Sequence, residues 1–561
     1  MTIQRELLKS LALNGDKTAI EYGQKRISYA SLRAASGKIT RFLLGRKLEP
    51  ETIVGVNLRN RADLISTVIG IINARCVFVL LDETLPPARQ WAVASQLNLQ
   101  YVITSRDVPQ FPFAGQGTPY LLEDLLAEAG ALTQEAQLPA FGEDDSLYVY
   151  FTSGSTGTPK GIVGRNGSLL QFARWETGAF GINGNTRVSQ LISPFFDAFL
   201  RDVFVPLLAG GTLCIPPADE DFFTPEKLIP WIEASGVHLI HCVPSLFRVF
   251  NNGTLTPNHF AHLRYVLLSG EKIIPSELTQ WYEQVGDRVQ LVNLYGPTEA
   301  TMIRSCYLIR PEDAKAARIP IGFPISDTEL VILNADGKPC RTLETGDLYI
   351  ASAYLTKGYL HNQALTAEKF VKLEAGTPRE KTAFRTGDKA RRLADGRVDL
   401  LGREDRQVKV RGIRVELDEI ENVMGQSPLV KNAVVIAHRD ETGMQTLSAF
   451  VVKGDSPPEG GDWHAALEGY LKEQLPAYMI PANLVAVSSY PLLKNGKINY
   501  QELLGQLVLT ALTAPANPTE ARILAIWKEI LGDKPISTED SFHRIGGNSL
   551  SIMRLIGRLY K

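Results

Sequence analysis

The chain has 561 residues, more than one hydrophobic core usually organises, and this length predicts three or four folding units. Its 59 basic and 61 acidic side chains leave a net charge of −2, and 44% of its residues are hydrophobic. Such a balance excludes a global field that would attract nucleic acid or a membrane surface, so partners must be inferred from local sites.

The five cysteines lie at least 28 residues apart, without the paired spacing of a zinc site or the density of a disulfide framework. The N-terminus lacks a cationic segment followed by an apolar one, and the most apolar stretch, 64–74, is far shorter than the roughly 18 residues of a membrane span. These features predict a cytoplasmic protein without a membrane segment.

Strand-like runs alternate with helical patterns from residue 50 to about residue 350. We expect a strand at 52–57, a helix at 61–75, a strand at 77–81, a helix at 85–97, and strands at 146–150, 237–242, 265–268 and 289–294. This alternation predicts α/β layering with substantial parallel sheet. Each of the later strands ends at a polar or glycine-rich turn, which is where open α/β sheets bind ligands.

A glycine- and hydroxyl-rich loop follows the strand at 146–150, in the run Tyr150-Phe-Thr-Ser-Gly-Ser-Thr-Gly-Thr-Pro-Lys-Gly161. Its glycines let backbone N–H groups turn toward an anion, and its hydroxyls add donors, so it suits a nucleotide phosphate better than it suits a flexible linker. It is not a Walker A loop, because Pro159 precedes the lysine and Gly161 follows it. The candidate phosphate-binding residues are Thr152, Ser153, Gly154, Ser155, Thr156, Gly157 and Lys160.

A second motif, Asn293-Leu-Tyr-Gly-Pro-Thr-Glu-Ala-Thr301, follows an apolar strand. Tyr295 could stack on a base, Thr298 could bind a phosphate, and the Glu299 carboxylate suits Mg²⁺, the hard cation of ATP chemistry. Taken alone, the same run is equally typical of a loop that caps a helix.

Three further segments complete the pattern. Asp388, in Phe384-Arg-Thr-Gly-Asp388, exposes an acid that suits the two ribose hydroxyls, although Thr-Gly-Asp is also a common turn. The basic residues between Arg403 and Arg414 are interleaved with acids and valines, which disfavours a nucleic-acid patch. In Lys494-Asn-Gly-Lys-Ile-Asn499, the Asn-Gly turn would present Lys497 at its tip.

A boundary falls where a charged turn gives way to the alternating strand 407–411. We therefore expect a large domain at 1–404, a smaller α+β domain at 405–508, a linker rich in Ala, Thr and Pro at 509–518, and an incomplete third domain at 519–561. The third domain begins with an amphipathic helix over 519–531, with Thr519 as its expected cap.

Five motifs in this order resemble the adenylate-forming superfamily, and within it the adenylation domains of nonribosomal peptide synthetases, over residues 20–505. The resemblance implies a large layered α/β N-terminal domain that binds ATP and substrate, a small mobile α+β lid, and a hinge at Asp405. It also implies that Lys497 reaches the substrate carboxylate and the α-phosphate, with Thr298, Glu299 and Mg²⁺ at the reacting centre. Asp388 and Arg403 would hold the ribose or phosphate, and the other implied ATP-binding residues are Gly270, Asn293, Tyr295 and Gly296.

The third domain resembles the start of a helical peptidyl carrier domain. In Phe542-His-Arg-Ile-Gly-Gly-Asn-Ser-Leu550, Ser549 would carry 4′-phosphopantetheine; taken alone, Gly-Gly-Asn-Ser-Leu is more typical of a turn that caps a helix. The later helices of such a bundle are missing after Lys561. The lack of a condensation-like segment before residue 1 is typical of an initiating or free-standing module, and an excised segment would look the same.

The same resemblance implies a substrate pocket. Asp197 occupies the position whose acid pairs with the substrate α-ammonium, which favours an α-amino acid over a keto, aryl or fatty acid. The side-chain pocket would be lined by Ala198, Arg201, His241, Leu267, Ser269, Leu294, Met302 and Ile303. His241, Leu267, Ser269 and Leu294 resemble pockets for small hydroxylated residues such as serine.

Two members of this pocket leave alternatives open. Arg201 departs from the large aromatic of serine-type pockets: its guanidinium either selects a carboxylate or amide side chain, or turns away to pair with Asp202 or another acid. His241 is either a substrate contact or a packed core histidine. The amino acid therefore stays undetermined by the sequence.

The expected function is activation of an α-amino acid by ATP, with release of pyrophosphate, and its transfer as a thioester to phosphopantetheine in antibiotic or siderophore biosynthesis. An acyl- or aryl-CoA ligase is the alternative within the superfamily, and a non-catalytic nucleotide-binding scaffold is the alternative outside it. The resemblance implies as partners a phosphopantetheinyl transferase and downstream condensation or other synthetase modules. The sequence leaves open whether a small MbtH-like protein is needed.

Overall fold

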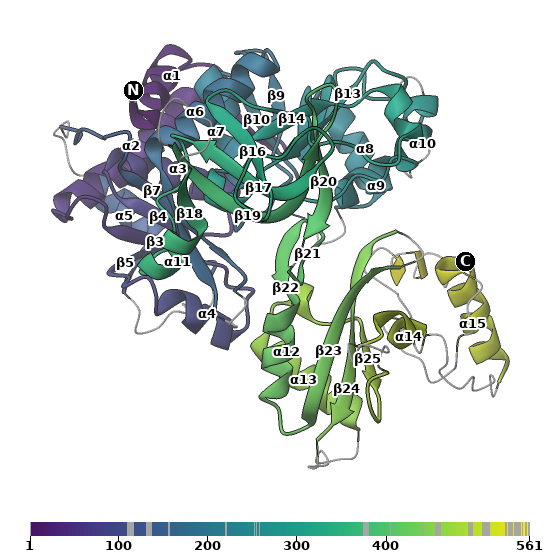
Figure 1. The fold of residues 1–561 in the computed structure, drawn as a ribbon. Coiled ribbons are helices and arrows are strands. Elements are labelled where there is room, and N and C mark those ends of the chain that lie inside the picture. Colours follow the sequence, from purple (N-terminus) through teal and green to yellow (C-terminus); the bar gives the residue numbers. More distant parts are fainter. Residues whose placement is uncertain are drawn as a thin grey trace. The chain divides into compact units, whose positions relative to one another are not determined.

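The computed structural model describes the chain except for residues 1, 109–116, 131–136, 155–157, 219–221, 252, 254, 257–258, 374–380, 404, 441–442, 455–461, 492–497, 506, 508–516, 533–535, 537–541, 543–550, 553, 556–557 and 559–561. It divides into two compact units (Figure 1). Unit 1 comprises Met1–Thr84, Gln90–Thr152 and Pro159–Asp405; unit 2 comprises Leu85–Arg89, Ser153–Thr158 and Arg406–Lys561.

A six-stranded sheet forms the first layer of unit 1. Its strand order is β6 (Thr118–Leu121), β5 (Tyr101–Thr104), β3 (Ile53–Asn57), β4 (Val77–Leu80), β7 (Ser146–Thr152) and β8 (Lys160–Arg165). All neighbours are parallel except β7 and β8, which pair antiparallel. The glycine-rich loop of the sequence therefore joins the two strands of an antiparallel pair at the sheet edge.

A nine-stranded sheet forms the second layer. Its strand order is β15 (Phe323–Pro324), β14 (Ser305–Leu308), β13 (Gln290–Tyr295), β12 (Tyr265–Ser269), β11 (Leu239–Cys242), β9 (Arg187–Ser189), β10 (Thr212–Ile215), β1 (Thr18–Tyr22) and β2 (Lys25–Ser28). The strands from β13 to β1 are parallel, and the edge pairings β13–β14, β14–β15 and β1–β2 are antiparallel.

Helices fill the space between these sheets. One buried cluster joins apolar residues of both sheets to helices α1 (Ile3–Leu13), α2 (Tyr29–Gly45), α3 (Arg61–Asn73), α5 (Leu122–Gly130), α6 (Asn166–Ala179) and α7 (Phe199–Ala209). Burial of apolar surface of this extent is the main driving force for folding. The predicted α/β layering is confirmed.

Outer helices cover the opposite faces of the two sheets. Leu239 and Leu267 belong to the inner cluster, whereas Ile240, Val266 and Leu268 pack against α8 (Pro225–Ala234), α9 (Pro244–Asn251) and α10 (Glu277–Gln284). This alternation is the period of two expected of strands buried on both faces. The last turns of α4 (Pro87–Ala94) pack in the same way on the six-stranded sheet.

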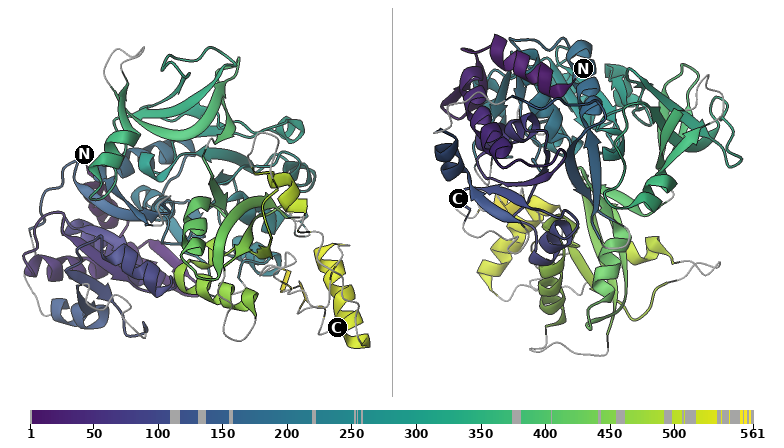
Figure 2. Two further views of the ribbon diagram at one scale, coloured as in Figure 1. Left: turned by 60° about the horizontal axis from the view of Figure 1, so that its bottom comes forward. Right: turned by 90° about the vertical axis from the view of Figure 1, so that its left-hand side faces the viewer.

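A third sheet forms a separate layer of unit 1 (Figure 2). It is antiparallel, in the order β16 (Thr328–Leu333), β17 (Thr345–Ser352), β19 (Lys381–Arg392) and β18 (Phe370–Leu373), with β20 (Val398–Arg403) also paired to β19. The helix α11 (Gln363–Lys369) and the short 3₁₀ turns η1 (Thr298–Ala300) and η2 (Pro311–Lys315) lie in the connections.

Unit 2 is a small α+β structure. A ribbon of β21 (Gln407–Val410) and β22 (Ile413–Glu416) leads to a sheet of β23 (Val430–Arg439), β24 (Gln445–Lys453) and β25 (Asn483–Ala486). One face of that sheet packs on α12 (Leu417–Gly425) and α13 (Trp463–Gln474), and the other packs on α14 (Tyr500–Gly505). The turn η3 (Ala477–Met479) precedes β25.

The helix expected at 519–531 is present as α15 (Pro518–Leu531), but its predicted cap was wrong. Asn517 is the N-cap, and its side chain accepts a hydrogen bond from the Glu520 backbone N–H at 2.9 Å. Asparagine is a stronger cap than threonine, and Pro518 suits the first helical position, where no N–H is required. Thr519 is therefore already inside the helix.

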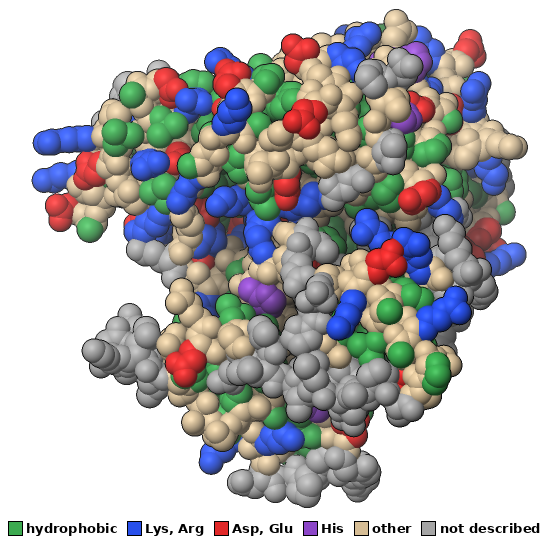
Figure 3. All heavy atoms as spheres, turned by 90° about the vertical axis from the view of Figure 1, so that its right-hand side faces the viewer, with side chains coloured by type: hydrophobic (Ala, Val, Ile, Leu, Met, Phe, Trp, Pro, Cys, Tyr) green, Lys and Arg blue, Asp and Glu red, His purple; other side chains and the backbone are tan. Residues whose placement is uncertain are grey.

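Three observations bear on the predictions made from composition. All five cysteines are free thiols. In the described part of the chain, no helix is long and apolar enough to cross a membrane. Basic and acidic side chains are scattered over the same face of unit 1 in Figure 3.

Replacing Gly164 by alanine should destabilise unit 1, because a methyl group there would lie 1.9 Å from the ring of buried Tyr148, its cross-strand partner. The cost should be about 1–3 kcal/mol, typical of an overpacked core, and thermal unfolding measures it. Gly178→Ala is the matched control: it lies in α6 with no atom near the added methyl, so it should leave stability unchanged or raise it by up to about 1 kcal/mol. Equal melting temperatures for the two variants would contradict this packing.

Candidate active site

The Glu299 carboxylate, the expected Mg²⁺ ligand, is held by one loop of unit 1. Tyr359 donates its hydroxyl to Glu299 Oε1 at 2.8 Å, and the Thr356 hydroxyl donates to the Glu299 carbonyl at 2.7 Å. Glu299 is 1% exposed, so its position is set by these contacts and not by solvent. Neither Thr356 nor Tyr359 lies in a motif with a predicted role, and no local pattern indicates that their hydroxyls bond to Glu299.

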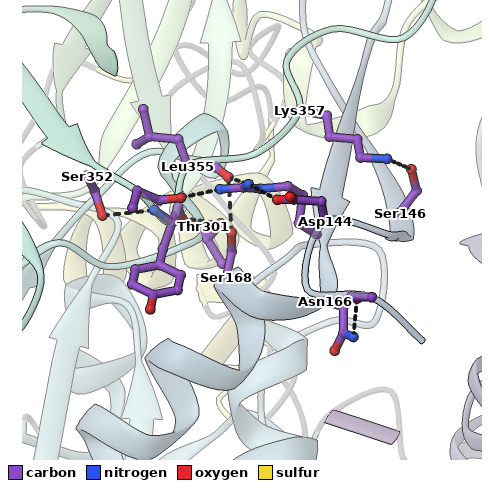
Figure 4. Close-up of polar contacts among 12 residues, drawn as sticks. Asp144, Ser146, Asn166, Ser168, Thr301, Ser352, Leu355 and Lys357 are labelled. Atoms are coloured by element: carbon purple, nitrogen blue, oxygen red, sulfur yellow. Dashed lines mark hydrogen bonds and ion pairs between the residues drawn. The ribbon is translucent and has the colours of Figure 1, made fainter. Parts of the chain in front are cut away.

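The 355–359 loop is fixed in turn to the six-stranded sheet and to α6 (Figure 4). Ser168 donates its hydroxyl to the Leu355 carbonyl at 3.0 Å. Lys357 Nζ donates to Ser146 Oγ at 2.8 Å, at the start of β7. Glu299 is thereby coupled to the strand that leads into the glycine-rich loop.

A single carboxylate is sufficient for a magnesium ion that also binds substrate phosphates, since Mg²⁺ in such sites keeps waters and takes one or two protein carboxylates. The described residues contain no cluster of three or more histidine, cysteine or acidic ligands. The donor set at Glu299 therefore fits Mg²⁺ delivered with a nucleotide, and does not fit a metal held by protein ligands alone.

Asp388 lies in a second polar network. Tyr295 donates its hydroxyl to Asp388 Oδ2, and Arg403 donates from Nη1 to Asp388 Oδ1 at 3.0 Å. Burial, and then the adjacent Asp388 carboxylate, raise the pKa of Tyr295 well above its ordinary value. An ionised carboxylate has about four lone-pair sites, so Asp388 can accept further hydrogen bonds from ribose hydroxyls.

Arg403 joins this network to Asp405, the predicted hinge residue. Its guanidinium also binds Asp405, with Nε to Oδ1 at 2.7 Å and Nη2 to Oδ2 at 2.6 Å. Burial would lower the pKa of Arg403, but the hydrogen bond with Asp405 and the charge of Asp388 raise it. The arginine thus remains cationic between two acids at the last residues of unit 1.

Gly296 permits the close folding of the segment that carries Met302 and Ile303. A methyl group on Gly296 would lie 2.4 Å from the Met302 carbonyl oxygen and 2.7 Å from the Ile303 Cα. Thr301 and Met302 both have left-handed backbone angles, at φ 66° and 67°, which is strained for such residues. The contact explains a glycine here without any appeal to a nucleotide.

The strand register brings the predicted pocket residues onto one face of the nine-stranded sheet. His241 lies opposite Leu267, and Ser269 lies opposite Leu294. Because residues two apart on a strand share a face, all four side chains point to the same side. The predicted residues Leu267, Leu294, Met302 and Ile303 belong to the buried cluster shared with α6 and α7.

His241 lies between two carboxylates in the interior. Nδ1 is 2.8 Å from Asp202 Oδ1 and Nε2 is 2.8 Å from Glu176 Oε1, and all three side chains are fully buried. Burial alone would lower the pKa of His241, yet the pKa is raised because Glu176 and Asp202 favour the charged ring. Both ring nitrogens are used within the protein, which favours the core-histidine alternative.

Arg201 is fully buried beside this group. Its Nη2 donates to Ser269 Oγ at 2.9 Å, and it forms no ion pair with Asp202 among the described residues. Its Nε and Nη1 have no hydrogen-bond partner in the described part of the chain. Among the described residues Arg201 therefore forms no ion pair with Asp202 or another acid, although its charge acts on Asp202.

Asp197 and Ala198 lie in the turn that leads into α7, and Ala198 is its N-cap. The Asp197 Oδ2 atom is buried without a partner among the described residues. Burial raises the pKa of Asp197. Hydrogen bonds from the Thr298 side chain and the Ala198 backbone, and the charge of Arg201, partly offset this increase, and the nearby Glu299 adds to it. Asp197 and Glu299 therefore lie within electrostatic reach of each other.

The remaining predicted residues divide into three groups. Asn293 donates its side-chain amide to the Pro320 carbonyl at 2.8 Å, Gly270 has a left-handed φ of 90°, and Thr152 and Lys160 lie opposite each other on β7 and β8. Ser153 and Gly154 are grouped with unit 2. Ser155, Thr156, Gly157, Lys497 and Ser549 lie outside the described residues.

A layered α/β core and a small α+β unit, with a buried acid, a candidate metal carboxylate and a tyrosine-bound aspartate, define an adenylate-forming enzyme. The chain belongs to the AMP-binding enzyme family, whose model matches residues 7–360. The model of the AMP-binding enzyme C-terminal domain matches residues 419–497, and that of the phosphopantetheine attachment site matches residues 521–561. These matches imply ATP with Mg²⁺, and 4′-phosphopantetheine, as cofactors.

Curated relatives place this arrangement in peptide synthetases. The chain is 32% identical over 556 residues to tyrocidine synthase 3 of Brevibacillus parabrevis, covering 97% of this chain and 8% of that protein. It is 31% identical over 580 residues to surfactin synthase subunit 1 of Bacillus subtilis, covering 100% of this chain and 16% of that protein. The chain thus spans a small part of the length of these relatives.

A solved structure shares the fold. Holo-PA1221, an NRPS protein containing adenylation and PCP domains bound to a vinylsulfonamide inhibitor, matches with a TM-score of 0.86 at 24% identity, covering 99% of this chain and 91% of that one. The resemblance to a nonribosomal peptide synthetase adenylation domain followed by a carrier domain is confirmed, as is the multidomain α/β fold class.

The buried group at His241 should make the stability of unit 1 depend on pH. A histidine whose folded pKa is raised stabilises fully below its unfolded value of about 6.5, and that stabilisation is lost as the pH rises through the folded pKa. His241→Gln should therefore lower stability by about 3–5 kcal/mol near pH 6, as when one partner of a buried ion pair is removed, and by less at higher pH. Thermal unfolding of both proteins across this range measures the difference, with His361→Gln, on an exposed loop, as the control. A difference that does not change with pH would contradict a charged His241.

Proposed function

We propose that the chain activates an α-amino acid with ATP, forming an aminoacyl-AMP and pyrophosphate, and then transfers the aminoacyl group to phosphopantetheine on the carrier domain. The proximity of Asp197 to Glu299 and Thr298 carries this proposal. An α-ammonium bound by Asp197 would leave the substrate carboxylate close to the site where Glu299 suits a phosphate-bound Mg²⁺.

The reaction needs cations because a carboxylate must approach the α-phosphate, which is also negative. We assign the neutralisation of this charge to Mg²⁺ at Glu299, to the glycine-rich loop and to Lys497. When bound, Mg²⁺ would supply Lewis-acid stabilisation of the phosphate oxygens. No covalent intermediate on the enzyme is required, since the carboxylate itself attacks.

Asp388 and Arg403 are proposed to position the ribose. Asp388 is oriented from two sides, by Tyr295 and by Arg403, so its free lone pairs have a defined direction. The ion pairs of Arg403 with Asp405 join this site to the proposed hinge. Rotation about such a hinge would let one cleft serve two reactions, adenylation and thioester formation.

The substrate side chain is proposed to occupy the pocket lined by Arg201, Ser269 and the apolar residues beside them. Both alternatives from the sequence remain open at this level: a small hydroxylated side chain, or an acidic or amide one.

We further propose a cytoplasmic location, supported by the five free cysteines, and binding of downstream synthetase modules. Whether an MbtH-like protein takes part is left to a binding assay.

ATP–pyrophosphate exchange tests this function most directly. The protein should catalyse exchange with one or a few α-amino acids and not with plain carboxylic acids. Lys497→Ala should reduce exchange by roughly 100-fold or more, the typical loss of one charge-stabilising donor, while leaving the unfolding transition unchanged. Exchange with plain carboxylic acids alone would indicate an acyl- or aryl-CoA ligase, and ATP binding without any exchange would indicate a nucleotide-binding scaffold.

Ser549 provides an independent test of the second half-reaction. In a protein with a complete carrier domain, a phosphopantetheinyl transferase should add the mass of phosphopantetheine, and Ser549→Ala should abolish this increase. Adenylate formation should be unaffected, because the serine acts only as the attachment point. The intact mass of each protein before and after treatment measures the modification. A mass increase that persists in Ser549→Ala would show that phosphopantetheine is attached at another residue. Ser551→Ala, two residues away, is the matched control.

A further inference from the structure

Two buried groups with unsatisfied hydrogen-bonding atoms lie about one helical turn apart at the start of α7. Asp197 lies in the turn before the helix, and its carbonyl accepts from the Leu200 N–H at 2.9 Å. Arg201 follows in the first turn. The charge of Arg201 acts on the Asp197 carboxylate, so the two groups lie near each other.

The unsatisfied atoms have complementary chemistry. Asp197 Oδ2 is an acceptor without a donor, and Arg201 Nε and Nη1 are donors without an acceptor, among the described residues. The two side chains do not satisfy each other, since no ion pair or hydrogen bond joins them in the described part of the chain. Buried polar groups in native proteins are nearly always hydrogen-bonded. The described part of the chain supplies no partner for these atoms of Asp197 and Arg201, so a bound ligand is a candidate for both.

Arg201 lacks hydrogen-bond acceptors although acids lie near it. The neighbouring acids Glu176 and Asp202 both bond to His241, whose cationic form is favoured between them. What Arg201 lacks is an oxygen for Nε and Nη1, because its only hydrogen bond in the described structure is the one to Ser269.

A carbonyl oxygen meets this requirement better than a hydroxyl does. Like a hydroxyl oxygen it accepts through two lone pairs, but the oxygen itself carries no proton that would have to point away from the guanidinium; in a carboxamide the protons are on the nitrogen. The planar guanidinium also matches planar oxygen acceptors, in carboxylates above all. The Ser269 hydroxyl, which already accepts from Nη2, retains a proton that can point to the same oxygen.

We propose that the amino acid activated by this chain carries a side-chain carbonyl oxygen, in a carboxamide or a carboxylate, which Arg201 binds while Asp197 binds the α-ammonium. This inference rests on the proposed function, since it names the substrate class of that same pocket. It makes Arg201 the residue that determines specificity. His241, Asp202 and Glu176 act as positioning residues that balance its charge.

Pyrophosphate exchange with the full chain and all twenty standard amino acids tests the inference. The preferred substrate should be asparagine, glutamine, aspartate or glutamate, with kcat/KM at least about 100-fold above that for leucine or methionine of similar size. Comparing the amides with the acids identifies which of the two carbonyl sources is used, and a preference for either supports the inference.

Arg201→Met should reduce kcat/KM for the preferred substrate by about 100-fold or more, raise it for an apolar amino acid of similar size, and leave the KM for ATP unchanged. Arg201→Lys keeps the positive charge but not the planar guanidinium, so its kcat/KM for the preferred substrate should lie between those of the unchanged protein and of Arg201→Met. Arg248→Met replaces another buried arginine of unit 1, which pairs with Glu277, and controls for a general loss of stability. Its substrate preference should be that of the unchanged protein.

Several outcomes would overturn the inference while leaving the proposed function intact. One is a preference of the unchanged protein for serine or for an aliphatic or aromatic amino acid, which needs no variant to fold. Another is an Arg201→Met variant that retains the original preference. In contrast, exchange with plain carboxylic acids only, or with no acid at all, would overturn the proposed function itself.

Discussion

The placement of four charged side chains in a dry interior is the constraint on which the candidate pocket depends. Glu176 on α6, Arg201 and Asp202 on α7 and His241 on β11 are all fully buried. Isolated charges are expensive in such surroundings, and they are tolerated only where opposite charges and hydrogen bonds compensate them. The helices must therefore pack on the sheet in the one register that brings these groups together.

This constraint separates structural from recognition roles among neighbouring residues. His241 has both nitrogens bonded, so its ring is committed to the core. In the described part of the chain, one nitrogen of Arg201 is hydrogen-bonded and two have no partner, so Arg201 can still bind a ligand. His241 lies on strand β11 and Arg201 on helix α7, and the difference between them arises because the acids of α6 and α7 bond to the histidine ring and not to the guanidinium. Glu176 is thus a determinant of the pocket although it would not touch the substrate.

The second network shows the same principle at the nucleotide side. Asp388 is bonded by Tyr295 and Arg403, and Arg403 is bonded by Asp405. An acid held from two sides loses little conformational entropy when a ligand binds, which is the benefit of preorganisation. Because the same arginine contacts the residue at the end of unit 1, the orientation of Asp388 depends on the backbone at Asp405.

Strands and their pairing, which depend on local sequence patterns, could be predicted from the sequence. Hydrogen-bond partners that are remote along the chain could not. The apolar runs that became β3, β4, β11, β12 and β13 are short, follow one another regularly and end at polar turns, so their parallel pairing could be inferred. The bonds of Glu299 to Tyr359 and of His241 to Glu176 join residues 60 and 65 positions apart, and no spacing rule indicates such partners. The direction taken by Arg201 depends on Ser269, 68 positions away, and for that reason the sequence left two alternatives. The Asn517 cap, in contrast, was within reach of sequence reasoning, since Asn-Pro before an apolar run is itself a helix-start signal.

Under the proposed function, the electrostatics of Asp197 link substrate binding to proton uptake and release. Burial raises the pKa of this acid despite the nearby charge of Arg201, so in the absence of substrate it binds a proton more tightly than an exposed aspartate would. An α-ammonium beside it would stabilise the carboxylate and lower that pKa. Substrate binding and proton binding at Asp197 therefore oppose each other, and affinity for the amino acid must fall as the pH drops through the pKa of the free acid. The same opposition favours a substrate that brings its own positive charge to Asp197, and it disfavours acids that lack an α-amino group.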